Sequence, residues 1–295
     1  MKYILIVIMT LISLTCNSQG LFGIRASSLQ IGPSFLLDQY SGAGAAYSLR
    51  QLSSTSTNAI RVERDSDNTQ SDIGFVDGEL DVSTLSSFCG GGDCKVVTIY
   101  DQSGNGYDVV SQNETALIYE SGALITANSL PIIQMTGDLF QSSTVDIADL
   151  INSNQTYIST VGSWGTLGSF ESAGIVAVFG SGFALGLDQY NFGSYSVEGS
   201  SNGGSIVATY NAQISGVHAV EYVWNAATST FIYVDGVDET DSSTPGTFTP
   251  ASYSIYIQNP FAPQQVDFQE VVIWPSNQIS NRSSINSNVM TYWGL

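Results

Sequence analysis

Aromatic side chains beside predicted loops give this chain its clearest means of binding a ligand. The sequence contains 15 tyrosines and 4 tryptophans. The face of such a ring stacks on the apolar face of a sugar, while its polar tip bonds a hydroxyl group. Trp164, Tyr190, Tyr195 and Trp274 flank predicted turns or loops, so they are the candidate sugar-binding residues. The alternative for each of these four residues is a place in the hydrophobic core.

Metal and nucleophile chemistry has little support in the sequence. His218 is the only histidine, and it lies on a strand of alternating pattern, where we expect a buried, hydrogen-bonded imidazole. This scarcity argues against a zinc site, and no Gly-x-Ser-x-Gly motif supports a serine triad. Residues 65–68 and 235–241 are acid-rich loops that could offer oxygens to Ca²⁺, although neither follows the EF-hand pattern. We therefore expect no required cofactor, with Ca²⁺ at one of these loops as the alternative to solvated acidic turns.

Two cysteines enclose a glycine-rich loop that leads directly into a β-branched strand. Cys89 and Cys94 are close enough in sequence to form a local disulfide, and the closure of so small a ring contributes roughly 2 kcal/mol. They are the two cysteines that remain after an exported chain loses its leader, and an oxidising compartment favours their pairing. The alternative is two free thiols.

The first 18 residues predict a secretory signal peptide. Lys2 precedes an apolar run of about a dozen residues, which is too short to span a bilayer comfortably. Cleavage is expected near Ser18–Gln19, which makes the protein secreted or displayed at the cell surface. The alternative is lipoprotein processing at Cys16, for which the preceding Thr15 is a poor match because a small residue is wanted there. No later segment has the length and apolar character of a transmembrane helix.

The charge of the chain excludes one class of partner. The formal net charge is −19, from 26 acidic and 7 basic residues. Such a surface repels nucleic-acid phosphates and anionic lipid headgroups. A soluble extracellular protein without a nucleic-acid partner fits this composition.

The pattern of apolar residues predicts an all-β fold. Short alternating or apolar runs predict strands at residues 60–64, 95–100, 131–135, 155–161, 174–179, 183–187, 205–210, 217–224, 229–235, 252–258 and 268–274. Two short helices are expected at residues 82–88, capped by Asp81, and at residues 283–292. We expect one β-sandwich domain over residues 19–295, and the alternative is a division near residue 115.

One stretch carries a family resemblance. Residues 88–106 read FCGGGDCKVVTIYDQSGNG, and this string resembles the first part of the catalytic domain of arabinofuranosidase B, glycoside hydrolase family 54. The upstream segments 47–50, 60–64 and 71–74 agree, so the resemblance covers about residues 36–112. The predicted hairpin at residues 218–236 is similar to concanavalin A-like, laminin-G-like domains. The resemblance implies a concanavalin A-like jelly-roll β-sandwich with one or two short helices.

The resemblance also indicates where catalytic carboxyl groups would lie. Glycoside hydrolysis uses two of them, one on each side of the scissile bond. Asp188 lies at the position of the nucleophilic glutamate of the family, and Asn259 at the position of its acid/base aspartate. An aspartate is one methylene shorter than a glutamate, and asparagine cannot donate the proton that general acid catalysis needs. Asp101, in the best-matched turn, is either a sugar ligand or an acceptor for its own turn amides.

These observations predict a carbohydrate-binding protein without efficient catalysis, whose partner is a polysaccharide or a cell-surface glycan. The first alternative is an active α-L-arabinofuranosidase that acts on arabinose-containing polysaccharide, with Asp188 as nucleophile and an unidentified second acid. The second alternative is a structural or adhesive surface protein, or a component of a phage appendage.

Overall fold

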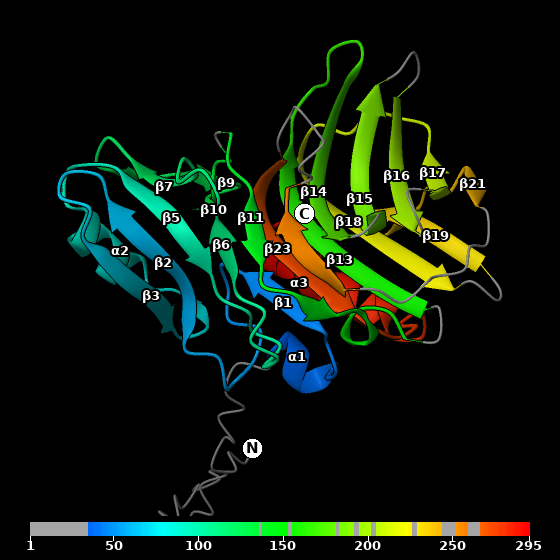
Figure 1. The fold of residues 1–295 in the computed structure, drawn as a ribbon, viewed down its shortest axis with the longest axis horizontal. Coiled ribbons are helices and arrows are strands. Elements are labelled where there is room, and N and C mark those ends of the chain that lie inside the picture. Colours follow the sequence, from blue (N-terminus) through cyan, green and yellow to red (C-terminus); the bar gives the residue numbers. More distant parts are fainter. Residues whose placement is uncertain are drawn as a thin grey trace, which may run out of the picture. The chain divides into compact units, whose positions relative to one another are not determined.

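The computed structural model describes residues 35–135, 137–152, 155–180, 183–191, 195–201, 205–225, 229–243, 252–258 and 266–295. The expected signal peptide, with Cys16, and the candidate Asn259 lie outside the described residues. Antiparallel strands dominate the described part of the chain (Figure 1). In that part, no helix is both long and apolar enough to cross a membrane.

A six-stranded antiparallel sheet forms one layer of the fold. Its strands, in spatial order, are β1 (Ala45–Ser48), β23 (Val266–Trp274), β13 (Gln155–Trp164), β18 (Gly216–Asn225), β19 (Ser229–Val234) and β20 (Val237–Asp238). The central strands β13, β18 and β23 are buried almost without interruption. Because neighbouring residues of a strand point to opposite faces, both faces of this sheet are covered.

A second sheet of 15 strands runs from the second half of the chain back to its first half. Its main path is β21 (Ser242–Ser243), β17 (Ser205–Tyr210), β16 (Tyr195–Ser201), β15 (Phe183–Asn191), β14 (Glu171–Gly180), β22 (Ser252–Ile257), β11 (Phe140–Ser142), β6 (Val109–Ser111), β5 (Cys94–Ile99), β2 (Asn58–Arg64), β3 (Gln70–Val76) and β4 (Glu79–Leu80). The short strands β12 (Val145–Asp146), β7 (Leu117–Glu120) and β8 (Ala123–Leu124) pair at its side. Strands from both sides of residue 115 therefore share one sheet. A single domain over residues 19–295 stays a prediction, because residues 19–34 are not described.

The main core lies where the two sheets face each other. Strand β14 contacts β13 and β23, and side chains of both sheets belong to one cluster of buried apolar residues. Gly162 of β13 permits this approach, because a Cβ atom there would lie 2.7 Å from the Cδ1 atom of Ile175 on β14 and 2.7 Å from the carbonyl oxygen of Asp267. These two packed sheets confirm the predicted concanavalin A-like sandwich.

The described residues include three α-helices, α1 (Leu36–Gln39), α2 (Val82–Cys89) and α3 (Arg282–Trp293). Asp81 caps α2 as predicted, since its carboxylate accepts a hydrogen bond of 2.9 Å from the amide of Thr84. Helix α3 buries Ile285, Val289 and Trp293, which recur every four residues on one face. The helices predicted at 82–88 and 283–292 are confirmed, whereas α1 was not predicted.

The strand predictions are mostly confirmed, with one error. Residues 131–135 do not form a strand, since only Pro131 belongs to one, the two-residue β10 (Leu130–Pro131) that pairs with β9 (Thr126–Ala127). Ile133 and Gln134 make isolated bridges to Phe268 and Leu117. This segment runs between β23 and β7, which buries Ile132, Ile133 and Met135 without a regular strand. The other predicted strands overlap observed ones. Strands β1, β3 and β16 were not predicted, and neither were the short strands β4, β6, β7, β8, β9, β11, β12, β20 and β21.

The predicted disulfide between Cys89 and Cys94 is confirmed, with a Cα–Cα distance of 5.8 Å. It joins the end of α2 to the start of β5. Replacing both cysteines with serine is expected to lower the free energy of unfolding by about 2 kcal/mol, because the unfolded chain gains the freedom of a small ring. Urea denaturation of the oxidised protein and of the double variant measures this difference. Equal midpoints would contradict the expectation.

Candidate functional site

Asp188 lies inside a strand rather than after one. It belongs to β15, where its backbone is opposite Gly174 of β14 on one side and Glu198 of β16 on the other. Its side chain is fully buried. Strand β15 therefore holds this carboxyl group in the interior of the wide sheet, away from open solvent.

The candidate acid/base position, Asn259, directly follows Gln258, which is the last described residue of this segment. The amide of Gln258, just after β22, donates a 3.1 Å hydrogen bond to the carbonyl oxygen of Ile175 on β14. Its φ of 75° is unusual for a residue other than glycine. Since β15 and β22 both pair with β14, Asp188 and Gln258 flank the same short stretch of β14, two strand spacings or roughly 9.5 Å apart. Asn259 follows directly and lies outside the described residues.

The four aromatic candidates are in strands. Trp164 ends β13 with 2 % of its surface exposed, and Trp274 ends β23 with none exposed. The indole of Trp274 donates a 2.9 Å hydrogen bond to the carbonyl oxygen of Tyr40. Neither tryptophan offers a ring face to solvent, so both lie in the core, the stated alternative. Tyr190 and Tyr195 lie on the paired strands β15 and β16, and their side chains are outside the described part.

Asp101 organises its own turn. Its carboxylate accepts hydrogen bonds from the amide and hydroxyl of Ser103, at 2.9 and 2.7 Å, and from the amide of Tyr107 at 3.1 Å. It also accepts one of 2.9 Å from the amide of Ala46 on β1. Its four acceptor positions are thus occupied by the protein. Burial, together with the charge of Asp101, raises the pKa of the neighbouring Asp108.

The acid-rich loops considered for calcium are also engaged in internal contacts. Asp65 pairs with Lys95 at 2.7 Å, and Asp67 pairs with Arg64 at 2.6 Å. In the other loop, Asp235 pairs with His218 at 2.8 Å. Within the described residues, no group of three or more histidine, cysteine, aspartate or glutamate side chains is placed to hold a metal ion.

His218 is half-buried and bonded at both ring nitrogens, to the carboxylate of Asp235 and to the carbonyl oxygen of Ser215. The hydrogen bond to Asp235 raises the pKa of His218, although partial burial opposes the shift. A raised folded-state pKa gives a stabilisation that is complete below the unfolded pKa and is lost as the pH rises through the folded value. We therefore expect His218→Gln to destabilise the protein by up to about 1 kcal/mol at pH 5.5 and by less at pH 8.5. Denaturation at the two pH values measures this, and an effect that grows with pH would contradict it.

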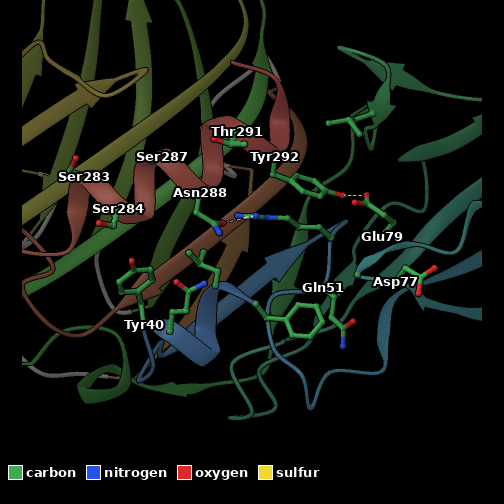
Figure 2. Close-up of a pocket in the computed structure, with 16 residues that line it drawn as sticks. Tyr40, Gln51, Asp77, Glu79, Ser283, Ser284, Ser287, Asn288, Thr291 and Tyr292 are labelled. Atoms are coloured by element: carbon green, nitrogen blue, oxygen red, sulfur yellow. Dashed lines mark hydrogen bonds between the residues drawn. The ribbon is translucent and has the colours of Figure 1, made fainter. Parts of the chain in front are cut away.

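A pocket of about 930 Å³, lined by both polar and apolar side chains, contains none of the sequence-predicted site residues. It is bordered by α1, by Arg50 and Gln51, by the turn between β3 and β4, and by α3 (Figure 2). In Figure 2, Tyr40 faces Ser284 of α3 across it, whereas the amide of Gln51 points away from α3 and donates to the carbonyl oxygens of Ser53 and Ser56. We name it the α1–α3 pocket. Its lining was not predicted, although the polar residues of the predicted helix at 283–292 recur with helical spacing.

Arg50 and Glu270 form a buried ion pair at the base of this pocket. The guanidinium group donates two hydrogen bonds to the carboxylate, at 2.6 and 2.9 Å, and a third of 2.7 Å to the side-chain oxygen of Asn288. The hydroxyl of Ser48 and the indole of Trp293 donate to the same carboxylate, at 2.9 and 3.2 Å. Two-point contact fixes the guanidinium plane, so the network holds α3 against β1 and β23.

The part of the pocket lining that the β3–β4 hairpin contributes is acidic. The hydroxyl of Tyr292 donates to Glu79, and the guanidinium of Arg50 stacks 4.7 Å from the centre of the Tyr292 ring. Burial and the hydrogen bond to Glu79 raise the pKa of Tyr292, so the phenol stays neutral and remains a donor. Asp77 adds a second exposed carboxylate on the β3–β4 turn.

The two packed sheets define a concanavalin A-like β-sandwich, and comparisons identify its family. Residues 39–211 match the family described as alpha-L-arabinofuranosidase B, catalytic. The chain therefore belongs to this family of arabinofuranosidase B catalytic domains, as the resemblance predicted. No curated protein sequence matches the chain.

Solved structures agree on the fold. A family 54 α-L-arabinofuranosidase soaked with a cyclic sulfate inhibitor is 17 % identical with a TM-score of 0.62, and the match covers 84 % of this chain and 62 % of that one. An arabinofuranosidase complexed with arabinofuranosyl-α-1,2-xylobiose is 18 % identical with a TM-score of 0.59, over the same shares of each chain. This chain thus spans less than two thirds of the length of these proteins.

Proposed function

We propose that this chain binds carbohydrate at or outside the cell surface and is not an efficient hydrolase. The observation that supports this most directly is Asp188, a fully buried aspartate within β15 at the position assigned to the family's glutamate nucleophile. A nucleophile has to contact the anomeric carbon, and a shift of about 1 Å costs on the order of 100-fold in rate. A shorter carboxyl group enclosed within the sheet is poorly placed for this attack, which favours a binding protein over an efficient hydrolase.

The proposed ligand is an arabinose-containing polysaccharide, because a structural neighbour was crystallised with an arabinofuranosyl-xylobiose. Affinity gel electrophoresis of the purified protein tests this, with arabinoxylan, arabinan and a set of plant and algal polysaccharides in the gel. We expect retardation on an arabinose-containing glycan and none in a gel without polysaccharide. Unchanged mobility on every glycan would overturn the proposal and would favour a structural or adhesive role.

Membership of the catalytic-domain family favours a second candidate, an active α-L-arabinofuranosidase. Release of 4-nitrophenol from its α-L-arabinofuranoside distinguishes the two, with Asp188→Asn as the variant. Our proposal expects a wild-type rate within about 10-fold of that of Asp188→Asn, whereas loss of a working nucleophile costs far more. A wild-type rate at least 1,000-fold above the variant would establish the enzyme instead.

We further propose that residues 1–18 are a cleaved signal peptide. The disulfide supports export, since such bonds persist in oxidising compartments. Mass spectrometry of the protein recovered from the culture medium should give a chain that starts at Gln19. A membrane-bound chain carrying lipid on Cys16 would replace this proposal with lipoprotein anchoring.

A further inference from the structure

The α1–α3 pocket and Asp188 lie on different sides of the six-stranded sheet. Gly162 of β13 approaches Ile175 of β14, which is the strand beside Asp188. Val161, next to Gly162 on β13, points to the opposite face of the sheet. Glu270 of β23 is paired with Val161 and shares that face, and its carboxylate accepts a hydrogen bond from Trp293 of α3. One face of the sheet therefore meets the strands around Asp188, and the other meets α3. A ligand in the pocket would not occupy the Asp188 region.

The lining of the pocket matches the chemistry of a sugar. Helix α3 supplies hydroxyl and amide groups from Ser284, Ser287, Asn288 and Thr291, which lie on one helical face. Tyr40 and Phe35 supply rings from the side of α1. Hydroxyl-rich and aromatic side chains together bind both the polar edges and the apolar face of a sugar ring. The volume of about 930 Å³ lies within the roughly 300–1,000 Å³ of small-ligand sites.

Charge selects against acidic ligands. Among the described lining residues, Arg50 is the only cation, and its charge is already balanced by Glu270 at 2.6 Å. Asp77 and Glu79 then leave the pocket with a net negative charge. A uronate, sialate or phosphate group would meet this field without a free cation to pair with, and burying such an unpaired charge is costly.

The polar wall is held in place before any ligand arrives. Asn288 is fixed by Arg50, and the hydroxyl of Tyr292 is fixed by Glu79. Arg50 itself is 5 % exposed and held at two points by Glu270. A lining that is already ordered loses little conformational freedom on binding, which favours affinity.

We propose that the α1–α3 pocket is a binding site for a short, neutral oligosaccharide, separate from the Asp188 region. This inference rests on the proposed carbohydrate-binding function and assigns that function to a place in the molecule. Hydroxyl, amide and phenol groups of the lining bind the carbohydrate, and no unpaired cation of the described lining takes part.

Titration calorimetry tests the assignment with xylotetraose and arabinofuranosyl-xylobiose as neutral probes and trigalacturonate as the acidic one. The variants Ser287→Trp and Ser284→Trp fill the pocket from exposed positions of α3. Ser87→Trp is the matched control, because Ser87 is an exposed serine on α2 that does not line the pocket. We expect either pocket variant to weaken binding of a neutral probe at least 10-fold, while Ser87→Trp changes it less than 2-fold. Circular dichroism melting verifies that each variant is folded.

The outcomes separate this inference from the proposed function. If the wild type binds and Asp188→Asn abolishes binding while both pocket variants bind normally, the pocket assignment is overturned and carbohydrate binding stands. If the wild type binds none of these probes and no polysaccharide in the gel, both fail together. Tighter binding of trigalacturonate than of the neutral probes, lost in the pocket variants, would also overturn the inference.

Discussion

Replacing Arg50 with methionine is expected to lower the free energy of unfolding by about 3–5 kcal/mol, because it leaves the fully buried carboxylate of Glu270 without a counter-ion. Methionine fills much of the same volume, so the loss reflects the unpaired charge more than a cavity. Chemical denaturation of the wild type and of Arg50→Met measures the difference.

A double-mutant cycle isolates the cause. Removing both charges, as Arg50→Met with Glu270→Leu, should recover most of the loss, since a buried ion pair replaced by apolar residues is often nearly neutral in stability. Arg61→Met is the matched control, because the Arg61–Asp72 pair is exposed and such pairs contribute at most about 1 kcal/mol. A double variant less stable than Arg50→Met would contradict the explanation.

Replacing Asp138 with alanine is expected to cost about 3–5 kcal/mol as well. The buried Asp138 carboxylate accepts six hydrogen bonds, five of them from backbone amides at Gln112, Asn113, Thr115, Ala116 and Leu139 and one of 2.6 Å from the hydroxyl of Ser111. Hydrogen bonds to a charged group contribute about 1.5–3 kcal/mol each, and stranded donors cost more. The segment that joins β6 to β7 depends on this one side chain.

Hydrogen exchange distinguishes this local role from general destabilisation. In Asp138→Ala, the amides of residues 112–116 should exchange faster than those of the central strands β13 and β18. Asp93→Ala is the control, because Asp93 accepts one amide hydrogen bond, from Ser121 at 2.6 Å, near the surface. We expect it to lose about 1 kcal/mol or less. Equal losses in the two variants would refute the special role of Asp138.

Local signals in the sequence predicted local structure well. The Asp81 cap, the Cys89–Cys94 pair and the β-branched run of β5 each depend on neighbours a few residues away. Strands β1 and β16 escaped prediction because their sequences, AAYS and YSVEGSS, carry little apolar pattern and gain their register from partner strands. The four-residue α1 is too short for a helical period to appear.

The candidate site was harder to predict, because its parts are distant in sequence. The ion pair between Arg50 and Glu270 joins residues 220 positions apart, and nothing in either neighbourhood indicates the other. The sequence predicted that Trp274 flanks a loop. Trp274 does end β23, but its side chain is fully buried and packs against Tyr157, with ring centres 5.4 Å apart. Periodicity shows which face of an element is apolar, but not which distant element covers it.

The pairing of β1 with β23 has a consequence for how the chain reaches its native state. Ala45 lies opposite Ile273, so one edge of the six-stranded sheet joins the first described strand to the last. This pair cannot form until β23 has been synthesised, and closure of so long a loop makes folding slow. An early-terminated product that ends before residue 266 would leave β1 and the flank of β13 as unpaired, aggregation-prone edges.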